Sequence, residues 1–327
     1  MNTFPDVRLR RLRRTPQLRA MLNQALPGPE RFMWPVFVRE GEGVAEPIDS
    51  MPGQFRYSID KVVDAIAPVW ASGVKSVLVF GLPDPATKDE CGNAAADSAG
   101  IVQRAVRALK SAYPELVVFT DVCLCAYTSH GHCGVIRNGN IENDPSLQHL
   151  ANTAVSHALA GADGVAPSAM MDGQVAAIRD ALAKEELHDT ILMSYSTKFA
   201  SSMYGPFRDA EQSAPQEGDR QSYQAPYADL DQALRESELD VAEGADMLMV
   251  KPALFYLDIV HQIKQRHRLP LAVYNVSGEY AMHIAMAERG WGDLNAMVRE
   301  STLAMARAGA DIIISYWANQ YEKIFQD

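Results

Sequence analysis

Residues 244–252 read GADMLMVKP, and the same arrangement occurs twice more, as GADGVAPS at 161–168 and GADIIISYW at 309–317. Each copy follows an Ala-rich stretch with helical periodicity, and each runs directly into an apolar segment. Gly is favoured just past a helix end because it tolerates positive φ. ASGVKSVLVFG at 71–81 is a looser copy. The repeat therefore predicts helices that lead into parallel strands.

Eight apolar runs along the chain have the length and character of strands. They are 32–38, 76–81, 116–125, 164–168, 191–196, 247–252, 271–277 and 311–317. Helical patterns separate them, for example 59–72, 103–112, 148–160, 174–184, 230–242 and 256–265. Eight alternating β and α elements predict a (β/α)8 TIM barrel of the α/β class. An open doubly wound sheet is the alternative, but no G-x-G-x-x-G follows the first run and no P-loop is present.

The composition limits the partners of the protein. The chain has 327 residues, 47% of them hydrophobic, and a formal net charge of −11. This acidic balance argues against nucleic-acid binding, which basic patches drive. The basic segment RLRRLRR at 8–14 is not followed by an apolar run, and no stretch approaches the length of a membrane span. A cytoplasmic protein without a nucleic-acid or membrane partner is expected.

Two parts of the chain are expected from this pattern. Residues 1–30 precede the first strand and form an N-terminal arm, and residues 31–327 form the catalytic barrel domain. The arginines of the arm fit an ordinary solvated surface. They equally fit an arm that wraps a neighbouring subunit, which would make the protein a homo-oligomer.

Two lysines fall at predicted strand ends, where barrel enzymes place their chemistry. Lys251 closes the apolar run 247–250, and Lys198 follows the preceding strand in SYSTKFAS. A lysine in apolar surroundings loses its proton easily and becomes a nucleophile for carbonyl carbons, although a lone lysine can also snorkel to the surface. A second cation at an adjacent strand end favours the neutral amine further. The pair indicates Schiff-base chemistry; alternatively, one lysine only binds an anion.

A long polar segment, about 200–229, follows Lys198 and is rich in Gly, Pro, Ser and Gln. Loops of this length in a compact domain usually serve as lids or binding loops. This one carries Arg208 and Arg220, whose guanidinium groups suit carboxylates. A carboxylate-bearing substrate under a lid is the resulting hypothesis, against the alternative of two solvated arginines.

The segment DVCLCAYTSHGHCG, residues 121–134, contains three of the four cysteines. On an extended strand, Asp121, Cys123 and Cys125 would share one face, and Cys133 returns after a short turn. Such a set can present three thiolates to one Zn²⁺ ion. Three free buried cysteines are the alternative, and a histidine of the turn, His130 or His132, could instead complete a closed structural site. Cys91 stands apart from the set.

Taken together, these motifs resemble the porphobilinogen synthase family, also called 5-aminolevulinate dehydratase. The resemblance spans nearly the whole chain and rests on RRLRR, DVCLCAYTSHGHCG, APSAMMDGQV, SYSTKFASSMYGPFRDA, GDRQSYQ, EGADMLMVKPALFYLDIV, YNVSGEYAM and AGADIIISYW. It implies a homo-oligomeric barrel, an octamer in the family, that condenses two 5-aminolevulinate molecules into porphobilinogen with loss of two waters in haem biosynthesis.

The resemblance also implies roles for individual residues. Lys251 would form an imine with the substrate that supplies the propionate side, and Lys198 with the substrate that supplies the acetate side. The implied zinc ligands are Cys123, Cys125 and Cys133, with water or substrate as the fourth. The implied substrate-binding residues are Arg208, Arg220 and Gln224 for one carboxylate, Ser277 and Tyr316 for the other, Ser168, Tyr204, Phe207 and Tyr274 as lining, and Asp121 beside the reacting centre.

Glu236, in LRESELD, matches the carboxylate that holds an allosteric Mg²⁺ in many bacterial members of the family. The alternative is an ordinary exposed glutamate on a helix.

Two rival functions remain at the level of sequence. A class I aldolase would explain Lys251 but neither the second lysine nor the thiolates, and a non-enzymatic ligand-binding barrel would not depend on Lys251.

Overall fold

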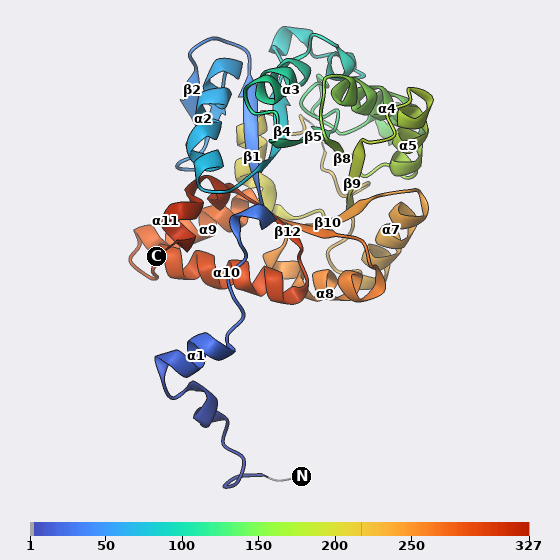
Figure 1. Cartoon of the computed structure of the whole chain (residues 1–327). Helices are drawn as coiled ribbons and strands as arrows, with labels where there is room; N and C mark the ends of the chain where they lie inside the picture. The colour runs from blue at the N-terminus through green and yellow to red at the C-terminus, as the bar shows by residue number, and fades with distance from the viewer. Residues whose placement is uncertain (1–2, 217, 327) are drawn as a thin grey trace.

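The computed structural model of the chain describes residues 3–216 and 218–326, and its centre is a closed parallel β-barrel (Figure 1). The barrel is sealed where β12 pairs with β1, through Phe32 with Ile313 and Met33 with Ile314. The predicted (β/α)8 barrel is confirmed. Its strands, in barrel order, are β1 (Phe32–Arg39), β4 (Ser76–Leu82), β5 (Val117–Val122), β8 (Gly164–Pro167), β9 (Ile191–Lys198), β10 (Met247–Lys251), β11 (Leu271–Asn275) and β12 (Ile312–Ser315).

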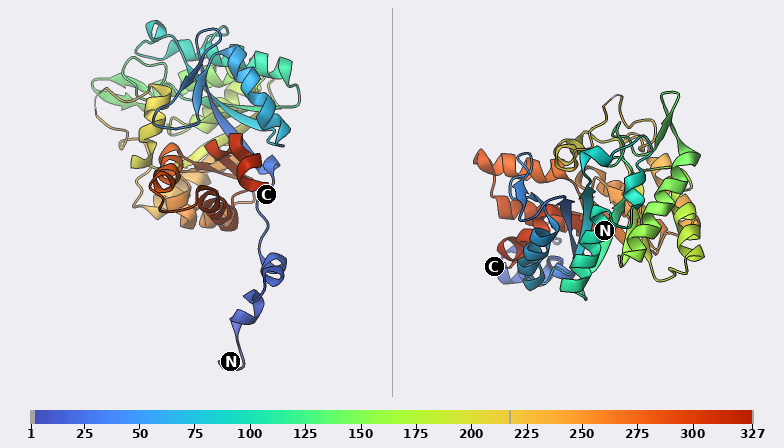
Figure 2. Two further views of the ribbon diagram at one scale, coloured as in Figure 1. Left: turned by 90° about the vertical axis from the view of Figure 1, so that its left-hand side faces the viewer. Right: turned by 90° about the horizontal axis from the view of Figure 1, so that it is seen from above.

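Helices surround the strands on the outside of the barrel (Figures 1 and 2). They are α2 (Ile59–Ala71), α3 (Ile101–Ala112), α4 (Asn143–Leu159), α5 (Gln174–Lys184), α7 (Leu230–Ala242), α8 (Leu257–Arg266), α9 (Ser277–Glu288), α10 (Leu294–Ala308) and α11 (Tyr321–Phe325). At the three GAD joins, Gly161, Gly244 and Gly309 have φ of 102°, 99° and 124°. Only Gly adopts this backbone readily, which is why the repeat marks the turn from helix to strand.

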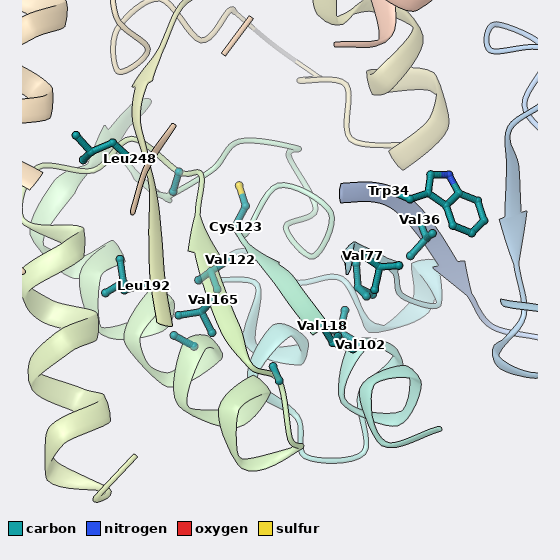
Figure 3. Close-up of a cluster of buried hydrophobic side chains, with 14 of the residues drawn as sticks. Trp34, Val36, Val77, Val102, Val118, Val122, Cys123, Val165, Leu192 and Leu248 are labelled. Carbon is teal, nitrogen blue, oxygen red and sulfur yellow. The ribbon is translucent and has the colours of Figure 1, made fainter. Parts of the chain in front are cut away.

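Alternate strand residues enter two separate hydrophobic cores. On β4, Val77 and Val79 pack outward against the helices, whereas Leu78 and Phe80 pack inside the barrel. Figure 3 shows part of the outer core, where Val118, Val165 and Leu192 come from neighbouring strands. A strand buried on both faces reads as a continuous apolar run, and this explains why the sequence revealed the strands so clearly.

Several predicted strand ends need correction. The run expected at 116–125 ends at Val122, so Cys123 and Cys125 follow the strand rather than alternate along it. The strand expected at 191–196 extends to Lys198. Two others stop early: Ser277 is the first residue of α9, and Tyr316 begins a short 3₁₀ turn after β12. The apolar content of the sequence does not show where hydrogen bonding between strands ends, so these boundaries were predicted inexactly.

Elements outside the barrel complete the fold. Strands β2 (Ala45–Pro47) and β3 (Phe55–Tyr57) extend β1 on the outside, and a hairpin joins β6 (Val135–Arg137) to β7 (Asn140–Glu142). Before β1, the chain projects away from the barrel and carries α1 (Pro16–Leu22) (Figure 1). Apolar side chains on this projection are exposed, namely Phe4, Val7, Leu9, Leu12, Met21 and Leu22.

Candidate active site

The two lysines lie side by side inside the barrel because β9 contains an irregularity. Leu248 pairs with Ser194, but Val250 pairs with Thr197, so β9 carries one more residue than β10 over this stretch. The extra residue reverses the alternation beyond it. Thr197 consequently faces outward, where its hydroxyl donates to the carbonyl of Ala233 on α7 (3.0 Å). Lys198 is the partner of Lys251 in the ladder.

Lys251 lies in an aromatic box. Its Nζ is 4.1 Å from the ring centroid of Tyr274 and 4.8 Å from that of Phe207. Tyr195 and Tyr204 complete the box at 5.0 Å and 5.5 Å. Burial lowers the pKa of Lys251 to about 7, and the positive charge of Lys198 contributes to the shift. A substantial share of neutral amine near pH 7 is what a lysine nucleophile requires.

Lys198 has more polar surroundings than Lys251. Its Nζ donates a hydrogen bond to the backbone carbonyl of Ser168 (2.5 Å) at the end of β8. Asp121, from the end of β5, belongs to the same group of side chains. Removal from water raises the pKa of Asp121 to about 7, repulsion from Glu211 adds to the rise, and Lys198 and Lys251 oppose it. The site thus contains a carboxyl and an amine that both titrate near neutral pH.

The three predicted zinc cysteines converge even though two of them lie beyond the strand. All three are buried, and their sulfur atoms lie within 4.8 Å of one another. The turn after β5 places Cys123 Sγ 3.3 Å from Cys125 Sγ, and the chain returns with Cys133. Hydrogen bonds from Cys123 and Cys125, aided by Arg220 and Lys198, lower the pKa of the Cys133 thiol well below its ordinary value. A buried trio of this geometry is suited to a metal ion.

Neither histidine of the turn joins the cysteine cluster. His130 receives the backbone N–H of His132 at Nδ1 (3.1 Å) and contacts the carbonyl of Glu90 through Nε2. His132 contacts the hydroxyl of Tyr223 through Nδ1 (3.1 Å). Within residues 3–216 and 218–326, the cysteine trio is the one group of three or more candidate ligands at this spacing. The alternative of a site closed by a fourth protein ligand from the turn is not supported.

The segment after Lys198 folds over the barrel mouth. It contains a 3₁₀ turn, Ser202–Tyr204, and the short helix α6 (Gly205–Glu211). Phe207 and Glu211 are buried on one face of α6, one turn apart. Arg56 of β3 holds the end of the helix by donating to the carbonyls of Ala210 and Asp209, both at 2.7 Å. The segment is therefore held against the barrel mouth, with the ring centroid of Phe207 4.8 Å from Lys251 Nζ.

A cavity of about 480 Å³ is lined by the segment itself, including Arg208, Arg220 and Gln224, and by Phe255 and Tyr256 from beyond β10. Nε of Arg208, Nε of Arg220 and both amide atoms of Gln224 are buried without a hydrogen-bond partner in the described part of the chain. Buried polar atoms are normally paired. Two guanidinium groups and an amide with unused bonding capacity are well suited to a carboxylate.

The remaining predicted site residues gather around Lys251. Ser277 accepts the backbone N–H of Phe207 (2.9 Å), and the hydroxyls of Tyr274 and Tyr316 lie 3.0 Å apart. Tyr204 donates to the carbonyl of Lys251 (3.1 Å). Ser277 and Tyr316 are therefore bonded to Phe207 and Tyr274, two walls of the aromatic box around Lys251.

Sequence reasoning missed three buried residues of the site. Tyr195 lies on β9 between the two lysines, 5.6 Å from Lys198 Nζ and 5.0 Å from Lys251 Nζ. Glu279 accepts the backbone N–H groups of Ala253 and Leu254, which follow Lys251. Alternate residues of β9 point into the barrel, and counting from Met193 would have predicted that Tyr195 faces the site. Glu211 had no recognisable signal, because a glutamate at a helix end usually faces water.

Glu236 is separate from these residues. It lies half-buried on α7, beside a small cavity that Asp172, Asp240 and Glu243 also line. Burial raises its pKa, and the neighbouring carboxylates Asp172 and Glu243 add to the rise. Its own hydrogen bond comes from Gln232 (3.5 Å). The position is acidic, but among the described residues it does not form a group of three closely spaced ligands.

Comparison with known proteins decides the family. A family model described as delta-aminolevulinic acid dehydratase matches residues 6–324. The chain belongs to the delta-aminolevulinic acid dehydratase family. A delta-aminolevulinic acid dehydratase of Methanothermobacter thermautotrophicus is 53% identical over 96% of both chains. The Bacillus subtilis protein of the same name is 48% identical over 97% of both.

A solved structure supports the same family. The delta-aminolevulinic acid dehydratase (porphobilinogen synthase) of Toxoplasma gondii ME49, in complex with the reaction product porphobilinogen, is 41% identical. It superposes with a TM-score of 0.95 and covers 97% of this chain and 91% of its own. The predicted family, the dehydratase class and the condensation of 5-aminolevulinate in tetrapyrrole biosynthesis are confirmed. In the part of the chain described, no helix is long and apolar enough to cross a membrane.

Proposed function

We propose that the dehydratase reaction proceeds through imines on both Lys251 and Lys198. The observation that carries this proposal is the pairing of the two lysines inside the barrel, where both are buried. A neutral amine adds to the ketone of 5-aminolevulinate, and loss of one water leaves the imine. Each imine tethers its substrate, so the two reacting carbons meet without a bimolecular encounter.

Lys251 is the better placed of the two to react first. Its pKa of about 7 supplies the neutral amine, and the aromatic box excludes water from the imine. An imine withdraws electrons more strongly than a ketone, and the adjacent carbon becomes acidic enough to form the new C–C bond. Asp121 lies near the lysines and titrates in the same range, which suits it to hold or move a proton there.

Cys123, Cys125 and Cys133 would hold a Zn²⁺ ion beside Lys198. The fit rests on three buried sulfurs within 4.8 Å, a donor set that zinc favours, and on a cluster that no protein group in the described residues completes. When bound, zinc supplies Lewis acidity and lowers the pKa of a coordinated water. Lys198 is among the groups whose charge lowers the pKa of the Cys133 thiol.

Two groups of residues would bind the substrate carboxylates. Arg208, Arg220 and Gln224 offer unpaired buried donors under the lid, near the second substrate. Ser277 and Tyr316 lie beside Lys251 and would bind the carboxylate of the first substrate once their present hydrogen bonds exchange. Ser168, Tyr204, Phe207 and Tyr274 line the lysines and would shape the site.

Two further proposals concern regions away from the lysines. Glu236 would bind a regulatory Mg²⁺ largely through water, because this ion keeps most of its hydration and needs few protein ligands.

The arm at 1–30 would bind a neighbouring subunit, since its apolar side chains are exposed in the isolated chain. A homo-oligomer, an octamer by family resemblance, would bury them. The barrel domain would then span 31–327 and the lid about 200–229.

The test is incubation with 5-aminolevulinate, detection of pyrrole with Ehrlich's reagent, and a parallel reaction with a zinc chelator. Pyrrole that depends on the metal supports the proposal. Pyrrole that persists after verified zinc removal would refute the zinc assignment. Imine trapping without any pyrrole would favour the aldolase alternative, whereas normal pyrrole formation by Lys251→Met would exclude the imine mechanism.

A further inference from the structure

A buried carboxylate lies against the cysteine cluster and has no part in the mechanism above. Glu211 is the last residue of α6 and is 4% exposed. Its Oε2 is 3.5 Å from Cys125 Sγ and accepts a hydrogen bond from the Ser213 hydroxyl at 2.6 Å. Burying a carboxylate is costly without strong compensation, and one hydroxyl and one weak thiol donor provide little. Within residues 3–216 and 218–326, its hydrogen-bond donors are therefore one hydroxyl and one weak thiol, and Lys251 interacts with it through charge alone.

The lid holds Glu211 in this place through several fixed contacts. Gln212 follows in the left-handed region, with φ of 52°, and turns the chain back so that Ser213 reaches the carboxylate. Arg220 donates to the carbonyls of Ser213 and Gly131, at 2.6 Å and 3.0 Å. Gly131 belongs to the turn before Cys133, so one arginine joins the lid to the cysteine loop.

The position of the carboxylate shows whether Glu211 could be a direct ligand of the metal or lies outside the ligand set. Ligands of one tetrahedral zinc ion lie roughly 3.5–3.8 Å apart, given bonds of about 2.0–2.3 Å. Glu211 meets this spacing to Cys125, but it is not within 4.8 Å of all three sulfurs. It therefore lies beside the trio rather than within it.

We propose that Glu211 is a positioning residue of the metal centre, which accepts a hydrogen bond from the water at the fourth coordination place. Because Glu211 is carried by the lid, the closed lid and the bound metal stabilise each other. The inference rests on the proposed cysteine metal site, and it concerns the carboxylate that orients the metal-bound water. Carboxylates in this outer position commonly fix the ligands of zinc sites.

The first experiment measures zinc release. The zinc-loaded protein is mixed with the chromogenic chelator 4-(2-pyridylazo)resorcinol, and the release rate is followed by absorbance. Glu211→Gln keeps the shape and should release zinc about 10-fold faster, and Glu211→Ala up to about 100-fold faster. Ser213→Ala should give a smaller increase in the same direction. Asp219→Asn, which removes an exposed carboxylate of the same lid, should match the wild type.

The second experiment separates this role from a structural one. Glu211→Gln removes a buried carboxylate that has only weak donors, so the thermal midpoint of the metal-free protein should stay unchanged or rise. A structural residue would lower that midpoint and leave the release rate unaltered. Limited proteolysis of the lid should show protection by zinc in the wild type and little in Glu211→Ala.

The outcomes are distinguishable from failure of the proposed function. Equal zinc release in the wild type and both Glu211 variants would overturn the inference, even with normal pyrrole formation. A faster release that merely parallels a lower metal-free midpoint would also overturn it. If the wild type binds no zinc at the cysteines, the metal assignment fails and the inference fails with it, while the imine mechanism is tested separately by trapping.

Discussion

Lys198 and Lys251 are partners in the ladder between β9 and β10, but they face different surroundings. Lys198 donates to a backbone carbonyl, whereas Lys251 lies among aromatic rings at 4.1–5.5 Å. Backbones of neighbouring strands are about 4.8 Å apart, so two amines on one side of such a pair share a single small space. The two lysines are thus equivalent in position and different in chemistry.

Replacement of either lysine should abolish the reaction. Lys251→Met should lower kcat by about 10³-fold or more, because the covalent intermediate is lost rather than weakened. Reduction with borohydride in the presence of labelled 5-aminolevulinate should attach label at Lys251 in the wild type, as read by peptide mass spectrometry. Label that remains absent from Lys251 while pyrrole forms would contradict this prediction.

The rate of imine formation should rise with pH through about 7. The pKa of Lys251 is lowered to about 7, so the reactive neutral amine grows as pH rises through that value and then levels off. Rapid quench followed by reduction measures the rate. Asp121 raises the pKa of Lys251, so Asp121→Asn should move the midpoint to lower pH. A midpoint near the ordinary value of lysine would count against the buried amine.

The sequence allowed the barrel to be predicted because GAD joins and doubly buried strands leave strong local signals. The orientation of Lys198 could not be predicted in this way. Counting alternate residues from Met193 and Tyr195 would direct Thr197 inward and Lys198 outward, and only the irregularity in β9 reverses them. Such an irregularity depends on pairing with β10, which no local pattern of β9 encodes.

The cysteine cluster illustrates a different limit. Its membership was predicted through alternation along a strand, yet Cys123 and Cys125 lie after β5 has ended. The three predicted residues converge through a turn whose geometry the sequence did not reveal. Glu211 was missed because its burial arises from the docking of α6, a tertiary contact made through Arg56.

Loss of one cysteine should remove the metal. Cys125→Ala should weaken zinc binding by about 100-fold or more. Loss of a residue that only hydrogen-bonds to a ligand lowers metal affinity by about 10-fold to 100-fold, and loss of the ligand itself should cost more. Elemental analysis after gel filtration checks this result. Cys91→Ala is the matched control, because Cys91 lies outside the cluster and should retain full zinc content. Unchanged zinc in Cys125→Ala would refute the ligand assignment.

Substitution of the lid arginines should weaken substrate binding. A hydrogen bond between charged groups contributes about 1.5–3 kcal/mol, so Arg208→Gln should lower kcat/KM by about 10-fold to 100-fold, mainly through KM. Arg208→Lys should recover only part of this, because lysine lacks the planar fork. Arg107→Gln, on the outer helix α3, is the control. Equal kinetics for the Arg208 and Arg107 variants would argue against the carboxylate role.

Magnesium should act through Glu236. Addition of Mg²⁺ should raise the activity of the wild type, and Glu236→Ala should abolish the stimulation without changing activity in the absence of Mg²⁺. Glu238→Ala, on the same helix with its carboxylate bonded to Arg266, should behave as the wild type. Stimulation that persists in Glu236→Ala would place the ion elsewhere.

The closure of the barrel has a consequence for how the protein is made. The seam joins Phe32 of the first strand to Ile313 of the last, so nearly the entire chain must leave the ribosome before the ring can form. Until β12 arrives, β1 and β11 present open edges, and such edges invite pairing with other chains. Contacts between distant parts of a chain also form slowly. Pairing with other chains is therefore favoured most while the ring is still open.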